Sequence, residues 1–576
     1  MTDDVQDGVT DHVSEPGRSG TPAAAGAAHV SDADAARRRA TSVLVAALAT
    51  IVLGWIVVLP PSAGSDEPGH VVRSAALVRG QLEDEGYLNV IFGGSYELPA
   101  WVGWPEPECW AFKLDVPVTC STLLDEPTGS ELRGTRAADY PVWGHLLPGV
   151  PTLLVDGPIG NRLARVFHAV IPVGLMAAAL LVSARRSRMA ATGVLVAITP
   201  VALFNAATVN PSGLVIAGGI ALWVALAGGS AGARGGVPPD RATRWLAAAG
   251  WAAMVLPRRD GLIYAGVILA IALGIGVSST ASLRRLLTLR PALLVGASTF
   301  AALAWAATSD ASSSRLLLLV PALPAAALGL RLALLRSGWS RRRLAASLAA
   351  LGGLAAVVGV VFVQRRDPLL DTVKWRQIVA ETAGDLFESF GVLGWLDAPM
   401  PTSFAYLFVG VVGALVGVVA LARPSGLVPP TVVLLTGILL SWWLTASQVD
   451  GSPEYWQGRY YLPLLVGVPI LLGSVREIDS LTDTRRFTQG IGVVVAIVSV
   501  VALGGAMRRF AVGIDGTMAP WRWHTFGAAV SPLFPMLLVA AAWIPLLWAV
   551  DRLGGERPAP ARDAAAPAPD PVEVDA

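Results

Sequence analysis

Long apolar segments alternate with clusters of arginine along most of this chain, and no other feature constrains the fold as strongly. The segments are about twenty residues long, the length that an α-helix needs to cross the hydrocarbon core of a bilayer. Hydrophobic residues make up 54% of the 576 residues and charged residues only 15%. Soluble domains carry roughly 25% charged residues. The pattern therefore predicts an all-α polytopic integral membrane protein.

The arginine clusters orient the predicted spans, because cytoplasmic loops of membrane proteins carry an excess of basic residues. Residues 37–39 are all arginine and precede the first apolar run at 41–60. A cleaved signal peptide has a shorter apolar core, so an uncleaved first helix is favoured. We expect about fourteen spans, with about eleven as the lower bound, in the plasma membrane and with both termini cytoplasmic. The spans fall near residues 41–60, 163–184, 190–208, 212–229, 245–256, 261–279, 291–308, 314–333, 344–363, 403–422, 428–446, 459–474, 487–505 and 532–550.

The rest of the chain divides into tails and loops around a membrane domain at 41–550. Residues 1–40 and 551–576 are expected to be disordered cytoplasmic tails, because they lack apolar periodicity. The span at 245–256 is short for a full crossing, so it must either reach the outer side or enter a protein-lined cavity. The predicted extracytoplasmic loops are 61–160, 364–402, 447–458 and 506–531.

The predicted outer face has a distinctive composition. Residues 61–160 contain fourteen acidic and five basic residues, and nine of the nineteen tryptophans lie in the four outer loops. An aromatic belt at the headgroup level accounts for such tryptophans, and stacking on sugars or lipids is the alternative. No basic tract is interleaved with aromatic residues, which argues against nucleic acid as a partner.

The only two cysteines, Cys109 and Cys120, both lie in the first outer loop. An oxidising exterior permits a disulfide between them, and two free thiols are the alternative. Two cysteines alone make a poor zinc site, because structural zinc takes four nitrogen or sulfur ligands.

A short acidic motif, Ser65-Asp66-Glu67-Pro68-Gly69-His70, directly follows the first span. Ser65 or Asp66 would cap a helix that continues to residue 82 and, being too polar to span, lies along the membrane surface. Helical spacing would place Asp66, His70 and Arg73 on one face. This face offers a carboxylate for general-base work or metal binding, an imidazole, and a guanidinium for phosphate. Plain capping with a surface ion pair is the alternative.

Four stretches in order along the chain resemble the motifs of a bacterial membrane family called domain of unknown function 2142. The first is the acidic motif with Arg73 and Gly80-Gln81, and the second is Tyr140-Pro141 with Pro148. The third and fourth are Ser389-Phe390-Gly391-Val392-Leu393-Gly394-Trp395-Leu396-Asp397 with Pro401, and Gln457-Gly458-Arg459-Tyr460-Tyr461-Leu462-Pro463. In the second stretch Val142 replaces the family's second proline.

The layout of this family resembles that of the GT-C membrane glycosyltransferases, which take sugars from polyprenyl-phosphate carriers on the extracytoplasmic face. The resemblance implies a polyprenyl-phosphate sugar donor and a cell-envelope glycan or glycolipid acceptor. It also implies that Asp66 or Glu67 is catalytic or binds a divalent metal such as Mg²⁺ or Mn²⁺. The absence of a nucleotide-binding motif fits a lipid-linked donor.

Roles within this scheme follow from residue chemistry. We predict Asp66 as the base, with Glu67 positioning it or sharing a metal, and His70 as a third catalytic candidate. Arg459 is the first choice for the lipid phosphate, followed by Arg259 and Arg73. The further candidates for substrate or phosphate binding are Gln457, Tyr460, Trp395 and Asp397.

Several alternatives remain open from the sequence. Arg459 would otherwise be an interfacial, snorkelling arginine, and Arg258-Arg259-Asp260 a local ion pair. Arg365-Arg366 and Arg508-Arg509 fall outside and break the charge rule, either through local errors in the topology or as anion-binding groups. Asp450 and Glu454 belong to a plain turn or contact an acceptor. A transporter of lipid-linked saccharides and a non-catalytic scaffold for envelope assembly are the competing functions.

Overall fold

The computed structural model describes residues 22–82, 94–105, 107–122, 127–235, 239–308, 320, 322–336, 372–446, 457–475, 477–478, 483–523 and 531–555. The predicted span at 344–363, the arginine pair at 365–366 and the acidic residues at 450 and 454 lie outside these ranges.

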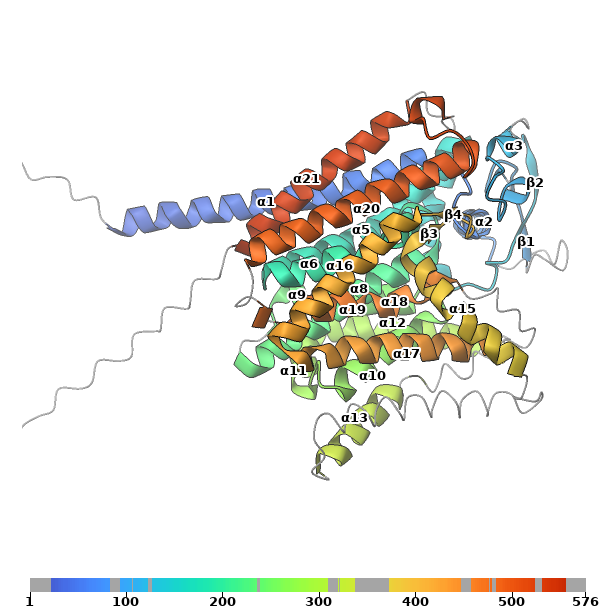
Figure 1. Cartoon of the computed structure of the whole chain (residues 1–576). Coiled ribbons are helices and arrows are strands. Elements are labelled where there is room, and N and C mark those ends of the chain that lie inside the picture. The colour runs from blue at the N-terminus through green and yellow to red at the C-terminus, as the bar shows by residue number, and fades with distance from the viewer. Residues whose placement is uncertain are drawn as a thin grey trace, which may run out of the picture.

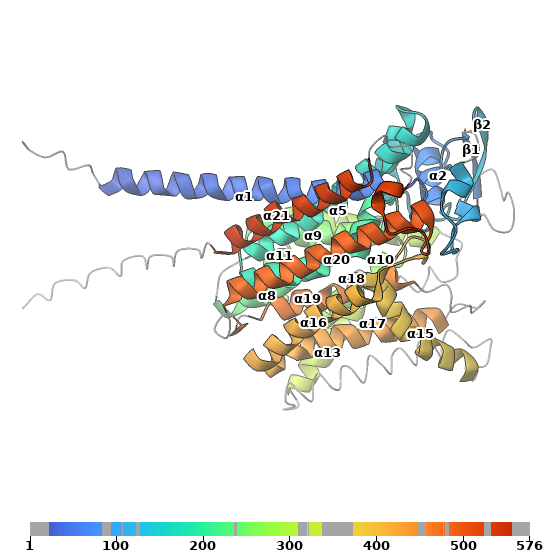
Figure 2. The same cartoon turned by 45° about the horizontal axis from the view of Figure 1, so that its top comes forward.

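Long helices run side by side and form one bundle (Figures 1 and 2). Among the described residues, eight helices are long and apolar enough to cross a membrane, and a bent pair makes a ninth. The eight lie in α1 (Pro22–Val58), α5 (Gly157–Ala184), α8 (Pro211–Gly235), α12 (Leu289–Thr308), α16 (Thr402–Ala422), α17 (Val428–Ala446), α20 (Thr484–Val512) and α21 (Leu533–Gly555). The bent pair is α6 (Arg188–Ala197) and α7 (Pro200–Ala207), with a 63° bend.

The other helices are shorter. They are α2 (Glu67–Val78), α3 (Thr119–Thr122), α4 (Leu146–Gly149), α9 (Arg241–Val255), α10 (Gly261–Gly274), α11 (Thr280–Leu286), α13 (Ala322–Arg336), α15 (Thr372–Gly391), α18 (Leu462–Leu465) and α19 (Gly467–Gly473). Helices occupy every predicted span that the structure describes. At four of these predicted spans the helices are too short to count as membrane crossings by themselves. The all-α membrane fold is confirmed, and the number of fourteen spans stays a prediction.

The bend between α6 and α7 follows from the local sequence. Pro200 has no amide hydrogen to donate and begins a new helix. The hydroxyl of Thr199 accepts a hydrogen bond from the backbone nitrogen of Ala202 at 3.1 Å and so caps that helix. The predicted continuous span at 190–208 is therefore two helices.

The N-terminal tail differs from the prediction, because α1 already begins at Pro22. The lack of apolar periodicity predicts disorder for residues 22–40. They are also rich in alanine, which has the highest intrinsic helix propensity. Continuity with the apolar span at 41–58 adds to this, since a helix propagates more easily than it nucleates.

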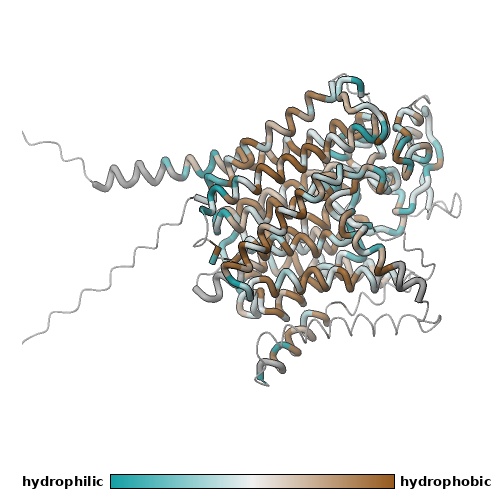
Figure 3. Tube along the Cα trace, in the orientation of Figure 1, coloured by the Kyte–Doolittle hydropathy of each residue, from teal (hydrophilic) through white to brown (hydrophobic). Residues whose placement is uncertain are grey.

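Hydropathy separates the middle of the bundle from its two ends (Figure 3). The core includes Trp55 and Phe204, whose rings meet edge to face at 6.2 Å. At one end, Asp551 near the end of α21 pairs with Arg188 and Arg485. The predicted cytoplasmic arginine clusters of these helices thus meet at a common end.

A small polar subdomain covers the opposite end of the bundle (Figure 1). It contains α2 and an antiparallel hairpin of β1 (Gly94–Pro99) and β2 (Ser130–Thr135), paired from Gly94↔Thr135 to Pro99↔Ser130. The short helices η1 (Pro107–Cys109), η2 (Val142–Gly144) and η3 (Val150–Leu153) complete it, together with α3 and α4. A second two-stranded pair, β3 (Val392–Leu393) with β4 (Ala398–Pro399), lies at the same end.

Helix α2 lies crosswise to the long helices, at the centre of this subdomain (Figure 1). Nine of its twelve residues are buried. Val71, Val72 and Ala75 form an apolar cluster with Tyr96 and Trp101. The hairpin and α4 cover this helix, and its place along the membrane surface stays a prediction.

Candidate functional site

Asp66 occupies a special backbone position at the start of α2. It is the N-cap residue, in the left-handed conformation with φ 63°, a region where aspartate is enriched among non-glycine residues. Its carboxylate makes no capping bond, and the side chain is 43% exposed. Ser65 fixes the turn, since its hydroxyl donates to the Gly394 carbonyl and its own carbonyl accepts from Nδ2 of Asn210 at 2.8 Å. Distant parts of the chain thus hold Asp66 at the surface.

Arg459 is the partner of Asp66. Its Nη2 lies 2.7 Å from Oδ2 of Asp66, and its side chain is only 7% exposed. Arg459 belongs to η7 (Gly458–Tyr460), which packs against α15. A Cβ at Gly458 would lie 2.3 Å from the backbone nitrogen of Ser389, so this close approach requires glycine. Two residues selected from different motifs, 393 positions apart, therefore form one ion pair.

Arg258 lies beside this pair, and sequence reasoning treated it only as a local ion pair. That pair exists, with Nε and Nη2 at 2.8 and 2.9 Å from the Asp260 carboxylate. The guanidinium also lies over the rings of Tyr460 and Tyr140, at 4.9 and 5.8 Å from their centroids. Such contacts stabilise a desolvated cation. Two arginines and two tyrosines therefore form one connected cluster, which meets the Asp66 carboxylate through Arg459.

The position of Arg258 also shows which end of the bundle the short predicted span at 245–256 reaches. Its Nη1 donates to the hydroxyl of Ser212 at 2.8 Å, next to Asn210 at the start of α8. Helix α9 therefore reaches the end of the bundle that carries α2. The signal for Arg258 was present in the sequence, in the basic pair that follows this short segment.

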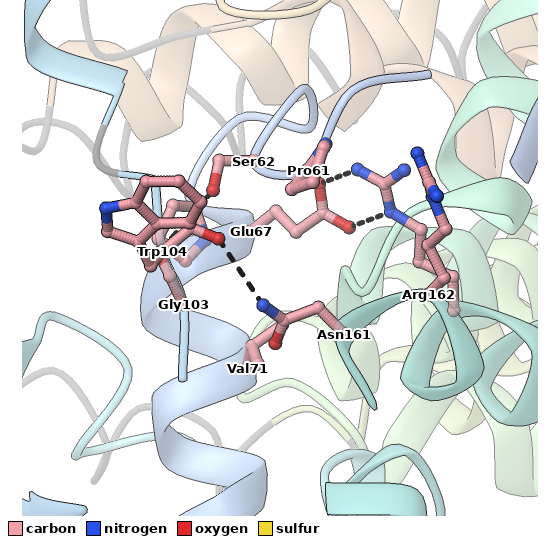
Figure 4. A pocket seen from close by; sticks show the side chains of 10 residues that line it. Pro61, Ser62, Glu67, Val71, Gly103, Trp104, Asn161 and Arg162 are labelled. Carbon is pink, nitrogen blue, oxygen red and sulfur yellow. Dashed lines mark hydrogen bonds and ion pairs between the residues drawn. The ribbon is translucent and has the colours of Figure 1, made fainter. Parts of the chain in front are cut away.

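Glu67 points away from Asp66 and is fully engaged. Its carboxylate accepts two bonds from Arg165, both 2.7 Å long, and two from the backbone nitrogens of Gly64 and Val209, both 3.0 Å long. The exposed fractions of Glu67 and Arg165 are 3% and 2%. Figure 4 shows Glu67 at the side of a small pocket with Trp104, Asn161 and Arg162 around it, and Arg165 also lines this pocket. Arg165 also donates to two carbonyls at the end of α1, from Leu59 and Pro60.

The remaining catalytic candidate, His70, faces another histidine. Nδ1 of His70 lies 3.1 Å from Nε2 of His145, and both side chains are buried. The Tyr140 ring meets the two imidazoles edge-on, at 5.2 and 6.0 Å. Burial lowers the pKa of His70, and the charges of His145 and Arg459 lower it further. Burial also lowers the pKa of His145 to about 3, so both imidazoles are neutral at physiological pH.

Arg73 lies one turn after His70 in α2, but it does not join Asp66 as expected. It is 2% exposed, and it donates to the Tyr96 hydroxyl at 2.5 Å and to the Leu82 carbonyl at 3.3 Å. Its place as a phosphate ligand therefore needs correction, because it is directed under the hairpin. The reason is that the left-handed turn at Asp66 ends the helical spacing on which the prediction depended.

Asp397 also needs correction as a substrate contact. Its side chain has no exposed surface, and Oδ2 lies 2.7 Å from Nη2 of Arg509. Arg509 donates further to the carbonyls of Trp110, Lys113 and Val116. The outer arginine that broke the charge rule is thus neither misplaced nor a free anion site. It joins α20 to two outer loops.

The other predicted residues have mixed positions. Trp395 is half-buried and its Nε1 donates to the Ser62 carbonyl at 3.0 Å, next to the acidic motif. Gln457 is the N-cap residue of η7, two positions before Arg459. Arg259 donates to the Asp139 carbonyl at 2.9 Å. Tyr460 contacts both Arg258 and Arg459.

The acidic motif does not form a two-carboxylate metal site. Asp66 and Glu67 point to different arginines, and Glu67 has four donors on its two oxygens. Throughout the described ranges, no three histidine, cysteine, aspartate or glutamate side chains are grouped to hold a metal ion. The residues present thus do not fit the Mg²⁺ or Mn²⁺ that the resemblance implied.

Cys109 and Cys120 are joined in a disulfide. The bridge closes the loop that contains Trp110 and Lys113, whose carbonyls accept from Arg509. The two cysteines therefore restrain the loop that Arg509 attaches to α20.

The fold and the site together define a polytopic membrane protein with a helical bundle and a polar cluster at one end of that bundle. Residues 49–468 match the family described as "Predicted membrane protein (DUF2142)", which is more than half of the chain, and the protein belongs to that family. The resemblance drawn from the four motifs is thereby confirmed. No curated protein and no solved structure matches the chain.

Proposed function

We propose that this protein is a membrane glycosyltransferase that moves a sugar from a polyprenyl-phosphate donor to a cell-envelope glycan or glycolipid. The observation that carries the proposal is the Asp66–Arg459 pair. It joins a half-exposed carboxylate to a buried guanidinium at the polar end of the bundle. Donor and acceptor would meet at this end, on the extracytoplasmic side of the plasma membrane.

Arg459 and Arg258 would bind the lipid phosphate. A guanidinium binds phosphate oxygens in bidentate fashion and keeps its charge at any physiological pH. Aromatic rings lie against both guanidinium groups, and each guanidinium is also paired with a carboxylate, Arg258 with Asp260 and Arg459 with Asp66. A leaving phosphate would meet two guanidinium groups that are already in position, and such preorganised groups are an effective way to stabilise a transition state.

Asp66 would act as the base for the acceptor hydroxyl. In the resting protein Oδ2 of Asp66 is occupied by the ion pair with Arg459, at 2.7 Å. A donor phosphate that takes over Arg459 would release the carboxylate, so donor binding would activate Asp66. Glycosyl transfer passes through an oxocarbenium-like transition state, as glycoside hydrolysis does. The phosphate and the carboxylate would flank that cation.

The test is sugar transfer in proteoliposomes that contain a panel of polyprenyl-phosphate sugars, with and without divalent metal. Wild type should release sugar from at least one donor, and Asp66→Asn should lose about a hundredfold or more of that rate. Glu97→Gln is the matched control, because Glu97 is an exposed acid on β1 at the same end of the molecule. Transfer by Asp66→Asn at the wild-type rate would refute the proposal. Saturable donor binding without release by wild type would favour a transporter.

A further inference from the structure

The buried histidine pair has a fixed direction of hydrogen bonding. Nδ1 of His145 lies 3.2 Å from the carbonyl oxygen of Pro141, and a carbonyl can only accept. Nδ1 of a neutral His145 must therefore carry the hydrogen, which leaves its Nε2 as an acceptor. That Nε2 lies 3.1 Å from Nδ1 of His70, so His70 must donate from Nδ1.

The same hydrogen bonds determine whether Nε2 of His70 carries a hydrogen. A neutral imidazole carries one hydrogen, and in His70 it is on Nδ1. Nε2 of His70 is then a lone-pair acceptor, and no hydrogen bond from the described residues engages it. Without His145 the two tautomers of His70 would differ little in free energy, because nothing would require a hydrogen on Nδ1.

His70 also lies at the cluster proposed for the donor. It is a buried residue in the first turns of α2, and its backbone nitrogen donates to the Asp66 carbonyl at 3.1 Å. Tyr140 contacts both imidazoles and also lies under Arg258. An acceptor beside two phosphate-binding arginines suits a sugar hydroxyl, since the arginines themselves can only donate.

We infer that His145 is a positioning residue, which holds His70 in the tautomer protonated at Nδ1 so that Nε2 accepts a hydrogen bond from a hydroxyl of the bound sugar. This inference rests on the proposed function for the identity of the ligand. The tautomer itself depends only on the Pro141–His145–His70 chain. His145 was not selected by sequence reasoning, because no spacing relates it to α2.

Two variants separate positioning from packing. His145→Gln keeps an acceptor near the position of Nε2, and His145→Leu fills a similar volume without one. In the transfer assay we expect His145→Leu to lower kcat/KM about tenfold, mostly through KM, and His145→Gln to restore most of it. Equal activity of the Leu and Gln variants would overturn the inference.

Nitrogen-15 spectra of histidine-labelled protein test the tautomer without any donor. The chain has six histidines, and His70→Gln assigns the signal of His70. Wild type should show hydrogen on Nδ1 of His70, and His145→Leu should show a shift toward the other tautomer. Hydrogen on Nε2 in wild type would overturn the inference, even if His145→Leu failed to fold. A correct tautomer in a protein that transfers no sugar would instead count against the proposed function.

Discussion

Asp66 and Glu67 are neighbours in the sequence, yet their environments differ in almost every respect. Glu67 is buried, accepts four hydrogen bonds and is paired with Arg165 through two of them. Asp66 is 43% exposed and bonds to Arg459 through one oxygen. The left-handed turn at Asp66 causes the difference, because it sends the two carboxylates in separate directions.

A charged residue at the end of a membrane bundle can serve either folding or function. A saturated, buried pair has no capacity left for a ligand, and removing one partner leaves a buried charge that is very costly. A pair with a single bond and a partly exposed carboxylate contributes less to stability and can exchange its partner. We therefore assign Glu67–Arg165 to the architecture and Asp66–Arg459 to the working site.

The largest effect should come from Glu67→Gln. The substitution leaves the Arg165 guanidinium buried without a counter-charge, which should lower the free energy of unfolding by about 3 to 5 kcal/mol. The measurement is thermal or denaturant unfolding of the protein in detergent. A variant as stable as wild type would remove the distinction between the two carboxylates.

Asp397→Asn should have the next largest effect. It breaks the second saturated pair, with Arg509, but Arg509 keeps its carbonyl acceptors. We expect a loss of about 3 kcal/mol, at the lower end of the range for a broken buried pair. Hydrogen exchange of the loop around Trp110 should increase at the same time. Unchanged exchange there would show that Arg509 does not hold the loop.

Because His70 and His145 are buried, we expect the stability of the protein to depend moderately on pH. Burial lowers the pKa of His145 to about 3 and lowers that of His70 well below 6.5. The unfolded chain therefore binds more protons below pH 6.5, and stability should fall as the pH drops from 6.5 toward 4. Unfolding midpoints of wild type and of a His70→Gln, His145→Gln double variant should converge at low pH. Parallel curves for the two proteins would contradict the prediction.

Asp66→Asn should have the smallest effect on stability. The pair it breaks is partly exposed, and such pairs contribute about 1 kcal/mol or less. The unfolding curve should nearly overlay that of wild type, while sugar transfer is lost. A loss of stability comparable to that of Glu67→Gln would mean that both carboxylates belong to the architecture.

Much of the fold could be predicted from the sequence, because apolar length and arginine clusters report directly on membrane helices. The motifs also singled out Asp66 and Arg459, because a carboxylate and a guanidinium are suited to acid–base work and phosphate binding. The structure brings these two residues together as an ion pair. The assignments of Arg73 and Asp397 failed because burial depends on tertiary neighbours, and nothing local to these residues reveals Tyr96 or Arg509. His145 and Arg165 were missed for the same reason, since each acts through a partner 75 or more positions away.

Binding of an unglycosylated polyprenyl phosphate would show whether a phosphate replaces Asp66 as the partner of Arg459. We would titrate it into wild type, Asp66→Asn and Arg459→Gln in nanodiscs and measure the affinity of each. If the phosphate replaces Asp66 as the partner of Arg459, Asp66→Asn should bind it more tightly than wild type, and Arg459→Gln should bind it at least about tenfold more weakly. Equal affinity of all three proteins would contradict the account, because the Asp66–Arg459 pair would then take no part in donor recognition.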